Sequence, residues 1–350
     1  MTEVDEQMIR QFLEPLRSIQ PVTRPTPRTA RRQRRGMHAV EYAVIALGVV
    51  ALVGAIAFLS HRSGDGQPAG SRSVARHGAF AAARGWITVG GETVWAFDPT
   101  DPARRAVLWH HWGDPLAWSK DGTKLLIDGV NEGFVVLDAD GSVTRIAASK
   151  DSAGGTFTRD GSEVIYSRLG SIYRVSTHGG RAHVIAPGML PFFTGGLLSP
   201  DGTTLALQTS GFTTLNIANG HRHTVLTAAQ VKALNHDKLA NQVSPLAWYP
   251  DGTRLLMIAL NQSGTHCYTF SIGLDGRGYQ HVGPKGFCPM RATNSGDGSH
   301  FAFLLSTHPG RFGQFGILPT AGGRHHLREF QIPHTALSIN LAWNPLTAQR

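Results

Sequence analysis

The chain has 350 residues, of which 41% are hydrophobic and 16% charged, a composition that excludes an intrinsically disordered protein. Its 41 Gly and 19 Pro indicate many tight turns and favour an all-β architecture over a helical one. The formal net charge of +9 is the sum of two parts. Residues 1–60 contain eight Arg and five acidic residues, and the rest of the chain contains 25 basic and 19 acidic residues. Because the rest shows no basic stripe with interleaved aromatic residues, nucleic acid is not expected as a partner.

The first 38 residues are predicted to form a basic cytoplasmic tail with a short amphipathic helix. Apolar residues recur there at helical spacing, between a capping box at Thr2 and Asp5 and a stop at Pro21: Met8, Ile9, Phe12, Leu13, Leu16 and Ile19. Such a helix would lie on the inner leaflet or dock on a cytoplasmic partner. Six arginines follow without an acid among them, and we expect them to attract anionic lipid: Arg24, Arg28, Arg31, Arg32, Arg34 and Arg35.

A transmembrane helix is predicted over residues 39–60. Residues 42–59 are an apolar run of 18 residues, which as a helix rises about 27 Å and matches the hydrocarbon core of a bilayer. The preceding arginines indicate a single-pass protein of the cell membrane with a cytoplasmic N-terminus and an extracytoplasmic C-terminal part. A cleaved signal peptide is the alternative, but residues 57–60 lack the small-x-small pattern for cleavage. Residues 61–79, rich in Gly, Ser and Arg, are predicted to be a flexible linker.

From residue 116 onward a unit recurs that consists of a short strand, an Asp-Gly turn and a second apolar strand. Its aspartates are separated by 39, 41, 50 and 46 residues, a period typical of four-stranded propeller blades: Asp121, Asp160, Asp201, Asp251 and Asp297. We interpret these aspartates as structural turn residues, because Asp bonds to the nearby backbone and Gly accepts a positive φ. A further hairpin with its own turn follows each unit in phase.

The sixth unit is predicted to be split between the two ends of this region. Leu341, Ala342 and Trp343 repeat the first strand of the unit, and residues 86–98 supply the strands that ought to follow it. Pairing the two pieces would close the ring and leave no sheet edge open. The predicted fold is therefore all-β, a six-bladed β-propeller over residues 80–350 with a split closing blade, preceded by a single transmembrane α-helix.

The repeats resemble a known family. Ser199-Pro200-Asp201-Gly202, Tyr249-Pro250-Asp251-Gly252 and Ser119-Lys120-Asp121-Gly122, each followed by an apolar strand, are similar to the repeat of TolB-like β-propellers. The resemblance covers the propeller region and implies its fold. Such propellers serve as binding scaffolds in unrelated proteins and as the non-catalytic domain of prolyl-oligopeptidase-like enzymes, so the resemblance implies no single function. The retained anchor and the absence of a separate domain before the propeller depart from TolB itself, so its partners are not transferred.

A binding site is predicted on one face of the propeller. The Asp-Gly turns belong to one face, and the longest insertions belong to the other, which holds the connections between the second and third strands and between blades. The residues expected to bind a protein or small ligand there are Met189, Phe192, Phe193, Lys232, His236, His266 and Arg311. The alternative is that Phe192 and Phe193 plug the central channel or pack between blades.

Cys267 and Cys288 are the two cysteines of the chain, and the repeat places both on this same face. A disulfide between them would suit an oxidising compartment, and two free thiols are the alternative. No metal site or cofactor is expected, since no paired Cys spacing occurs and the His pairs lie in outer hairpin strands. No catalytic motif of a hydrolase, metalloprotease or nucleotide-binding enzyme appears.

The function predicted from these features is that of a membrane-anchored extracytoplasmic propeller. It would act as a non-enzymatic binding or scaffold module, with membrane lipid at its anchor and a protein or small ligand at its variable face. One alternative is a transmembrane signalling protein resembling an anti-sigma factor, in which the propeller senses and the tail binds a regulator. The other is a propeller hydrolase or lyase, which would need polar side chains converging at the channel mouth.

Overall fold

The computed structural model describes residues 79–346, except 130–132, 147–151, 188–196, 209–210, 234–239, 262–266, 285–286, 309–310, 322–326 and 332–339. The predicted tail, the predicted transmembrane helix and the linker before Ala79 lie outside the described residues. Within the described ranges, no helix is long and apolar enough to cross a membrane.

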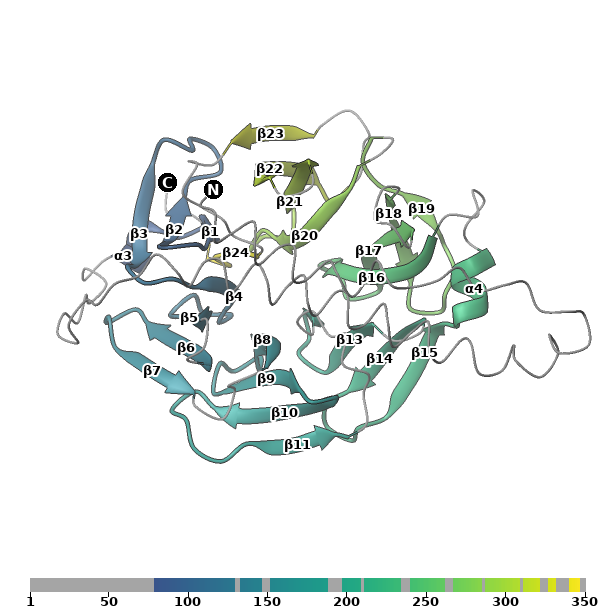
Figure 1. Cartoon of the computed structure of the whole chain (residues 1–350), viewed down its shortest axis with the longest axis horizontal. Coiled ribbons are helices and arrows are strands. Elements are labelled where there is room, and N and C mark those ends of the chain that lie inside the picture. Colours follow the sequence, from purple (N-terminus) through teal and green to yellow (C-terminus); the bar gives the residue numbers. More distant parts are fainter. Residues whose placement is uncertain are drawn as a thin grey trace, which may run out of the picture. The chain divides into compact units, whose positions relative to one another are not determined.

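The described residues form six four-stranded antiparallel sheets arranged as the blades of a propeller (Figure 1). Blade 1 has β4 (Asp114–Trp118), β5 (Lys124–Gly129), β6 (Gly133–Asp138) and β7 (Val143–Ile146). Blade 2 has β8 (Ala153–Phe157), β9 (Glu163–Arg168), β10 (Ser171–Ser176) and β11 (His183–Ala186). Blade 3 has β12 (Leu197–Leu198), β13 (Thr204–Gln208), β14 (Phe212–Asn216) and β15 (Arg222–Leu226).

The chain continues around the ring in the same order. Blade 4 has β16 (Ala240–Trp248), β17 (Arg254–Asn261), β18 (Cys267–Gly273) and β19 (Gln280–His281). Blade 5 has β20 (Pro289–Asn294), β21 (His300–His308), β22 (Arg311–Pro319) and β23 (Arg328–Gln331). The closing blade has β24 (Leu341–Trp343), β1 (Ile87–Val89), β2 (Val94–Phe97) and β3 (Arg105–Trp109).

The closing blade joins the two ends of the domain, as the repeat predicts. β24 pairs antiparallel with β1 in the register Ile87 to Trp343, Thr88 to Ala342 and Val89 to Leu341. Two further bonds fix the junction, since Trp343 Nε1 donates to the carbonyl of Gly85 at 2.7 Å and the backbone N–H of Asn344 donates to the carbonyl of Trp86 at 2.9 Å. The six-bladed ring and its split closing blade are therefore confirmed.

In all five Asp-Gly turns the Asp carboxylate accepts the backbone N–H two residues on, and in all but blade 4 it also accepts a Ser or Thr hydroxyl, as blade 5 shows. Ser295 Oγ donates to Asp297 Oδ1 at 2.6 Å, and the same oxygen accepts the backbone N–H of Ser299 at 3.0 Å. Gly298 follows with φ 69°, a value that L side chains rarely adopt. These bonds stabilise the charged form of the carboxylate and hold the pKa of Asp297 at about 2, as they do for Asp160 of blade 2. The motif aspartates are thus occupied by their own turns.

Two short helices pack against the blades. α3 (Ala79–Ala82) lies beside the closing blade and contributes Phe80 to the core. α4 (Ala228–Ala233) lies in the connection between β15 and β16. It begins with a capping box in which Gln230 Oε1 accepts the backbone N–H of Thr227 at 2.9 Å and Gln230 N–H donates to Thr227 Oγ1 at 3.2 Å. Val231 anchors α4 on the blades, since it is 2% exposed.

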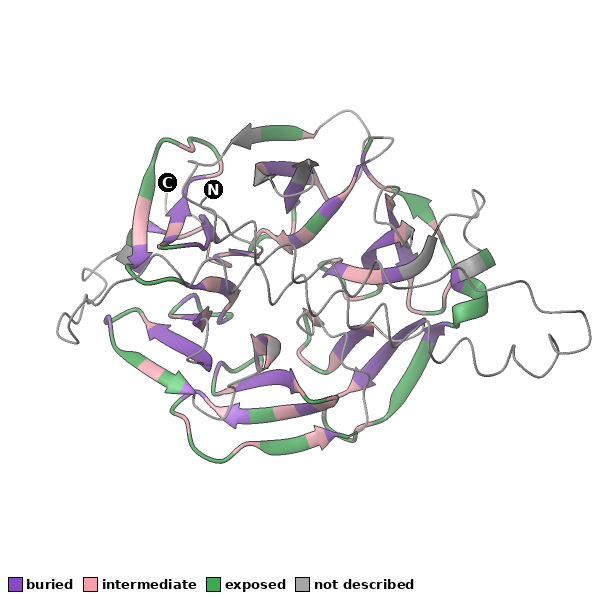
Figure 2. Ribbon diagram, in the orientation of Figure 1, coloured by how far each residue is buried: buried purple, intermediate pink, exposed green. Residues whose placement is uncertain are grey.

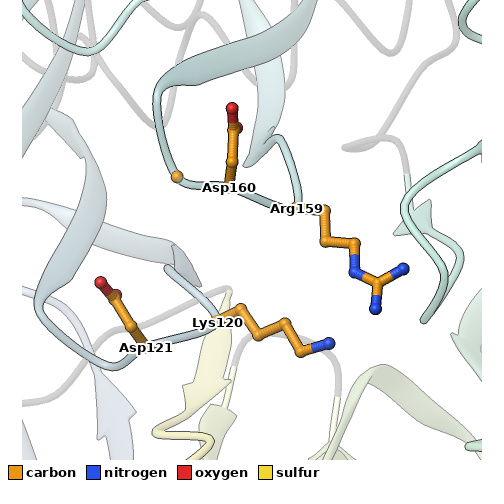
Figure 3. Close-up of a pocket in the computed structure, with 5 residues that line it drawn as sticks. Lys120, Asp121, Arg159 and Asp160 are labelled. Carbon is orange, nitrogen blue, oxygen red and sulfur yellow. The ribbon is translucent and has the colours of Figure 1, made fainter.

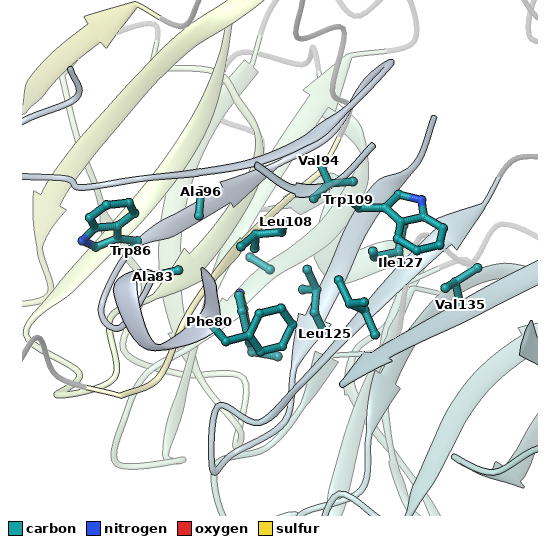
Figure 4. Packing of buried hydrophobic residues seen from close by; sticks show 13 residues of the cluster. Phe80, Ala83, Trp86, Val94, Ala96, Leu108, Trp109, Leu125, Ile127 and Val135 are labelled. Atoms are coloured by element: carbon teal, nitrogen blue, oxygen red, sulfur yellow. The ribbon is translucent and has the colours of Figure 1, made fainter. Parts of the chain in front are cut away.

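The core consists of apolar layers between neighbouring blades, with buried residues concentrated on inner strands and exposed ones on outer strands (Figure 2). One such layer joins the closing blade to blade 1 (Figure 4). Within it Trp118 Nε1 donates to Thr88 Oγ1 at 3.0 Å, so a polar hydrogen of blade 1 is satisfied by a fully buried hydroxyl of the closing blade. The blades are thereby held in a fixed relation to one another, which positions the side chains at both ends of the propeller axis.

A candidate binding site on the connection face

The two faces of the propeller follow from the path of the chain. In blades 1 to 5 the first strand lies near the axis and runs into an Asp-Gly turn, so these turns share one face, called here the Asp-Gly face (Figure 1). The opposite face, called the connection face, carries the turns between second and third strands and the links between blades. The sequence places its predicted site on the connection face.

Most residues of that predicted site lie outside the described residues. This applies to Met189, Phe192, Phe193, His236 and His266. Lys232 lies in α4 and Arg311 begins β22, and the structure describes the backbone alone at both positions. Whether these seven residues form one surface therefore stays a prediction.

The cysteines lie on the connection face. Cys267 begins β18 of blade 4 and Cys288 immediately precedes β20 of blade 5, and the two are joined in a disulfide with their Cα atoms 5.6 Å apart. A second link supports the same connection, because the buried Thr269 Oγ1 donates to the carbonyl of Phe287 at 2.9 Å. The start of β20 is thus tied to blade 4.

Charged side chains from blade 1 and blade 5 meet near the axis at this end. Asp114 is the first residue of β4 and pairs across the sheet with Asp128 near the end of β5, so two carboxylates stand on directly opposed positions. Arg291 lies near the start of β20, and its Nε donates to Asn340 Oδ1, just before β24, at 2.9 Å. All four residues are partly buried. Three inner strands, β4, β24 and β20, bring this group together, and each contacts the next.

Burial shifts the pKa values of Arg291 and Asp128 in opposite directions. Burial lowers the pKa of Arg291, and the charge of Asp114 opposes that shift, so Asp114 serves as the counter-charge of the guanidinium. Burial, followed by the charge of Asp114, raises the pKa of Asp128 to about 6. At neutral pH the group therefore holds two carboxylates against one guanidinium, since Asp128 is ionised above its raised pKa. A cationic group of a partner would find its counter-charge there.

Sequence reasoning missed this group, although one signal for it was present. Asp128 ends an apolar run, Leu125 to Ile127, at a strand position that faces the protein interior. No local sequence pattern marks Arg291, because this residue reaches Asp114 only once the ring has closed. A charged residue at the end of a buried strand is the sequence pattern that would have identified Asp128 as a candidate site residue.

Exposed apolar side chains also lie on the connection face. Among the described residues, five large hydrophobic side chains are exposed, and three of them belong to this face: Trp112, Leu169 and Met290. Trp112 lies in the link from the closing blade to blade 1, and Met290 precedes Arg291 in β20. Leu169, in the turn between β9 and β10, is 83% exposed and has φ 46°, the one positive φ of a non-glycine among the described residues. The positive φ costs the turn backbone energy, and the side chain is left open to a partner.

The raised pKa of Asp128 leads to a testable expectation for stability. The folded state binds the proton of Asp128 more tightly than the unfolded state, so ionisation between pH 4 and about 6 destabilises the fold. We expect Asp128→Asn to stabilise the protein by about 2 kcal/mol at pH 7.5 and by less than a third of this at pH 4. Chemical unfolding at both pH values measures the effect, with Asp251→Asn in an exposed turn as the control. Equal stabilisation at the two pH values would show that the gain does not come from ionisation.

The described residues contain no group of three or more His, Cys, Asp or Glu side chains placed to hold a metal ion. The pair Asp114 and Asp128 with Arg291 is instead suited to polar recognition, in which a guanidinium and a carboxylate bind complementary groups.

Comparison with known proteins supports the fold. No family model matches the chain, and no curated protein matches it. Two solved structures described as TolB are similar to it. The one from Agrobacterium tumefaciens has 15% sequence identity and a TM-score of 0.56, and the match covers 75% of this chain and 94% of that one. The one from Acinetobacter baumannii has 14% identity and a TM-score of 0.58, with 75% and 67% covered. At this identity the likeness concerns the propeller fold.

Proposed function

We propose that this protein is a membrane-anchored, extracytoplasmic propeller that binds a protein partner through its connection face. The observation that carries the proposal is that exposed apolar side chains, Trp112, Leu169 and Met290, share the connection face with the charged group of Asp114, Asp128 and Arg291. Protein interfaces combine apolar anchors with charged groups that set orientation and specificity. The protein acts as a binding module and not as an enzyme.

The anchor and the compartment rest on the sequence. The apolar segment 42–59 spans the bilayer, the preceding arginines stay in the cytoplasm next to anionic lipid, and the propeller lies outside. The disulfide between Cys267 and Cys288 supports this orientation, because disulfides persist in oxidising compartments. The fold shared with the two TolB structures is compatible with a binding role but does not identify the partner.

Site-specific photo-crosslinking in intact cells tests the proposal. A photoreactive amino acid replaces Met290 on the connection face or, as the matched control, Val184 on the outer strand β11, where the side chain is also exposed. We expect one discrete adduct from position 290, recovered with the membrane fraction, and none from position 184. Adding Arg291→Gln should reduce the adduct at least fivefold, because the guanidinium no longer fixes the partner's orientation. The same adducts from both positions would contradict a site on the connection face.

A further inference from the structure

The Asp-Gly face carries a basic pair that the turns themselves do not need. The Asp carboxylate and the Gly form each turn, joined in blades 1, 2, 3 and 5 by a Ser or Thr hydroxyl, and the residue just before Asp takes no part in this bonding. In blades 3, 4 and 5 that residue is Pro200, Pro250 or Gly296. In the adjacent blades 1 and 2 it is Lys120 and Arg159.

In blades 3 and 5, the glycine of the turn is closely covered by the residue just before Asp in the preceding blade, and in blade 4 Pro200 lies 3.8 Å from a methyl group built on Gly252. A methyl group built on Gly202 would lie 2.6 Å from Cβ of Arg159, and one built on Gly298 would lie 2.6 Å from Cβ of Pro250. Between blades 1 and 2 this contact is missing. A methyl group on Gly161 would meet only Ser119 Cβ, at 3.5 Å, so the side chain of Lys120 does not cover that turn.

A pocket of about 210 Å³ opens at this place. It is lined by Lys120, Asp121, Arg159, Asp160 and Gly161. Figure 3 shows the side chains of Lys120 and Arg159 extending to the same side, while the carboxylates of Asp121 and Asp160 point elsewhere.

The two carboxylates of the pocket are already bonded within their turns. Asp160 accepts the Thr158 hydroxyl at 2.6 Å and the Ser162 hydroxyl at 2.8 Å, and Asp121 accepts the Ser119 hydroxyl at 2.6 Å. The two cations make fewer hydrogen bonds than these carboxylates. Arg159 donates one bond, from Nη1 to the carbonyl of Asp201 at 3.1 Å.

Lys120 makes no hydrogen bond or ion pair within the part of the chain that the structure describes. The pocket thus offers unused N–H donors from two cations beside a turn that is left uncovered.

We propose that Lys120 and Arg159 bind a carboxylate presented by an acidic peptide segment of a protein. Two cations on the same side of a pocket, one in each blade, suit the two oxygens of a carboxylate. The lining as a whole has two positive and two negative charges, so a monoanion fits it better than a phosphate dianion or a nucleic acid. This site lies on the face opposite the proposed partner site, and it stands independently of that function.

Fluorescence anisotropy with the purified full-length chain in detergent tests this site. The probe is a fluorescein-labelled peptide of alternating Glu and Gly, and the same peptide with Gln in place of Glu is the negative control. The double variant Lys120→Gln with Arg159→Gln removes both cations. The matched control is Arg181→Gln with Arg277→Gln, which removes two exposed cations from outer hairpins of the same face. We expect the first pair to weaken binding of the Glu peptide at least tenfold and the second less than twofold.

A single variant protects the test against loss of folding. Lys120 is exposed and makes no hydrogen bond or ion pair among the described residues, so Lys120→Gln should melt like the wild type and still weaken binding at least threefold. If both double variants weakened binding of the Glu peptide equally, the overall positive charge of the protein would be attracting the peptide, and the proposed site would be wrong. Displacement of the peptide by an equimolar amount of inorganic phosphate would assign the pocket to phosphate and overturn the choice of carboxylate.

Discussion

Ending the chain at Asn340 is expected to abolish cooperative folding of the propeller. The deletion removes β24, whose Leu341 and Ala342 are 5% and 3% exposed, and leaves the edge of β1 unpaired. Leu341 packs with residues of blade 5, and Ala342 packs with the layer between the closing blade and blade 1. Losing a buried Leu and a partly buried Trp343 costs about 5 kcal/mol or more, which is comparable to the whole stability of a typical domain.

The matched control for this deletion ends the chain at Leu346. It keeps β24, the bond from Asn344 to the carbonyl of Trp86, and the packing of Leu346 against Gly122. Thermal unfolding followed by circular dichroism should show a single transition for the control, with a melting temperature close to that of the full chain. The chain ending at Asn340 should show none. A cooperative transition in the shorter chain, within a few degrees of the control, would mean that the ring is stable without its closing strand.

The blades were predictable because their signals are local. The turn at Asp297-Gly298 is built from one carboxylate, one hydroxyl and one positive φ, all within five residues, so its chemistry can be read directly from the chain. The split closing blade followed from the same repeat, since Leu341 to Trp343 have the pattern of a first strand without the rest of a blade. Periodicity thus determines the number and the order of the blades.

The candidate site was not predictable in the same way, because its residues meet only through the closure of the ring. Asp114 and Arg291 lie in blades 1 and 5, and their charges interact only because β24 fills the position between them. The exposure of Leu169 and Met290 likewise depends on which loops leave them uncovered. Lys120 and Arg159 are different, because a comparison of the five turns shows two adjacent bases where the other blades have Pro or Gly. That contrast was available from the sequence alone.

Removing the disulfide is expected to have the second-largest effect. Cys267→Ser with Cys288→Ser opens a cross-link between residues 21 apart, and the chain-entropy model gives a loss of about 3 kcal/mol. The native connection should survive, because Thr269 still bonds to the carbonyl of Phe287, and the backbone N–H of Val282 still donates to the carbonyl of Thr269 at 2.9 Å. The loss therefore arises mainly from the greater freedom of the unfolded chain.

Chemical unfolding with and without a thiol reductant separates the cross-link from the substitutions themselves. The reductant should lower the free energy of unfolding of the wild type by the same amount as the two substitutions do. It should not change the free energy of unfolding of the double variant. A loss below about 1 kcal/mol would mean that the connection between blades 4 and 5 is already constrained in the unfolded chain. Because Met290 and Arg291 belong to β20, which begins just after Cys288, the double variant should also keep the crosslink from position 290 as long as the protein is folded. Loss of that adduct at temperatures where the variant remains folded would show that the disulfide positions the partner site as well as stabilising the fold.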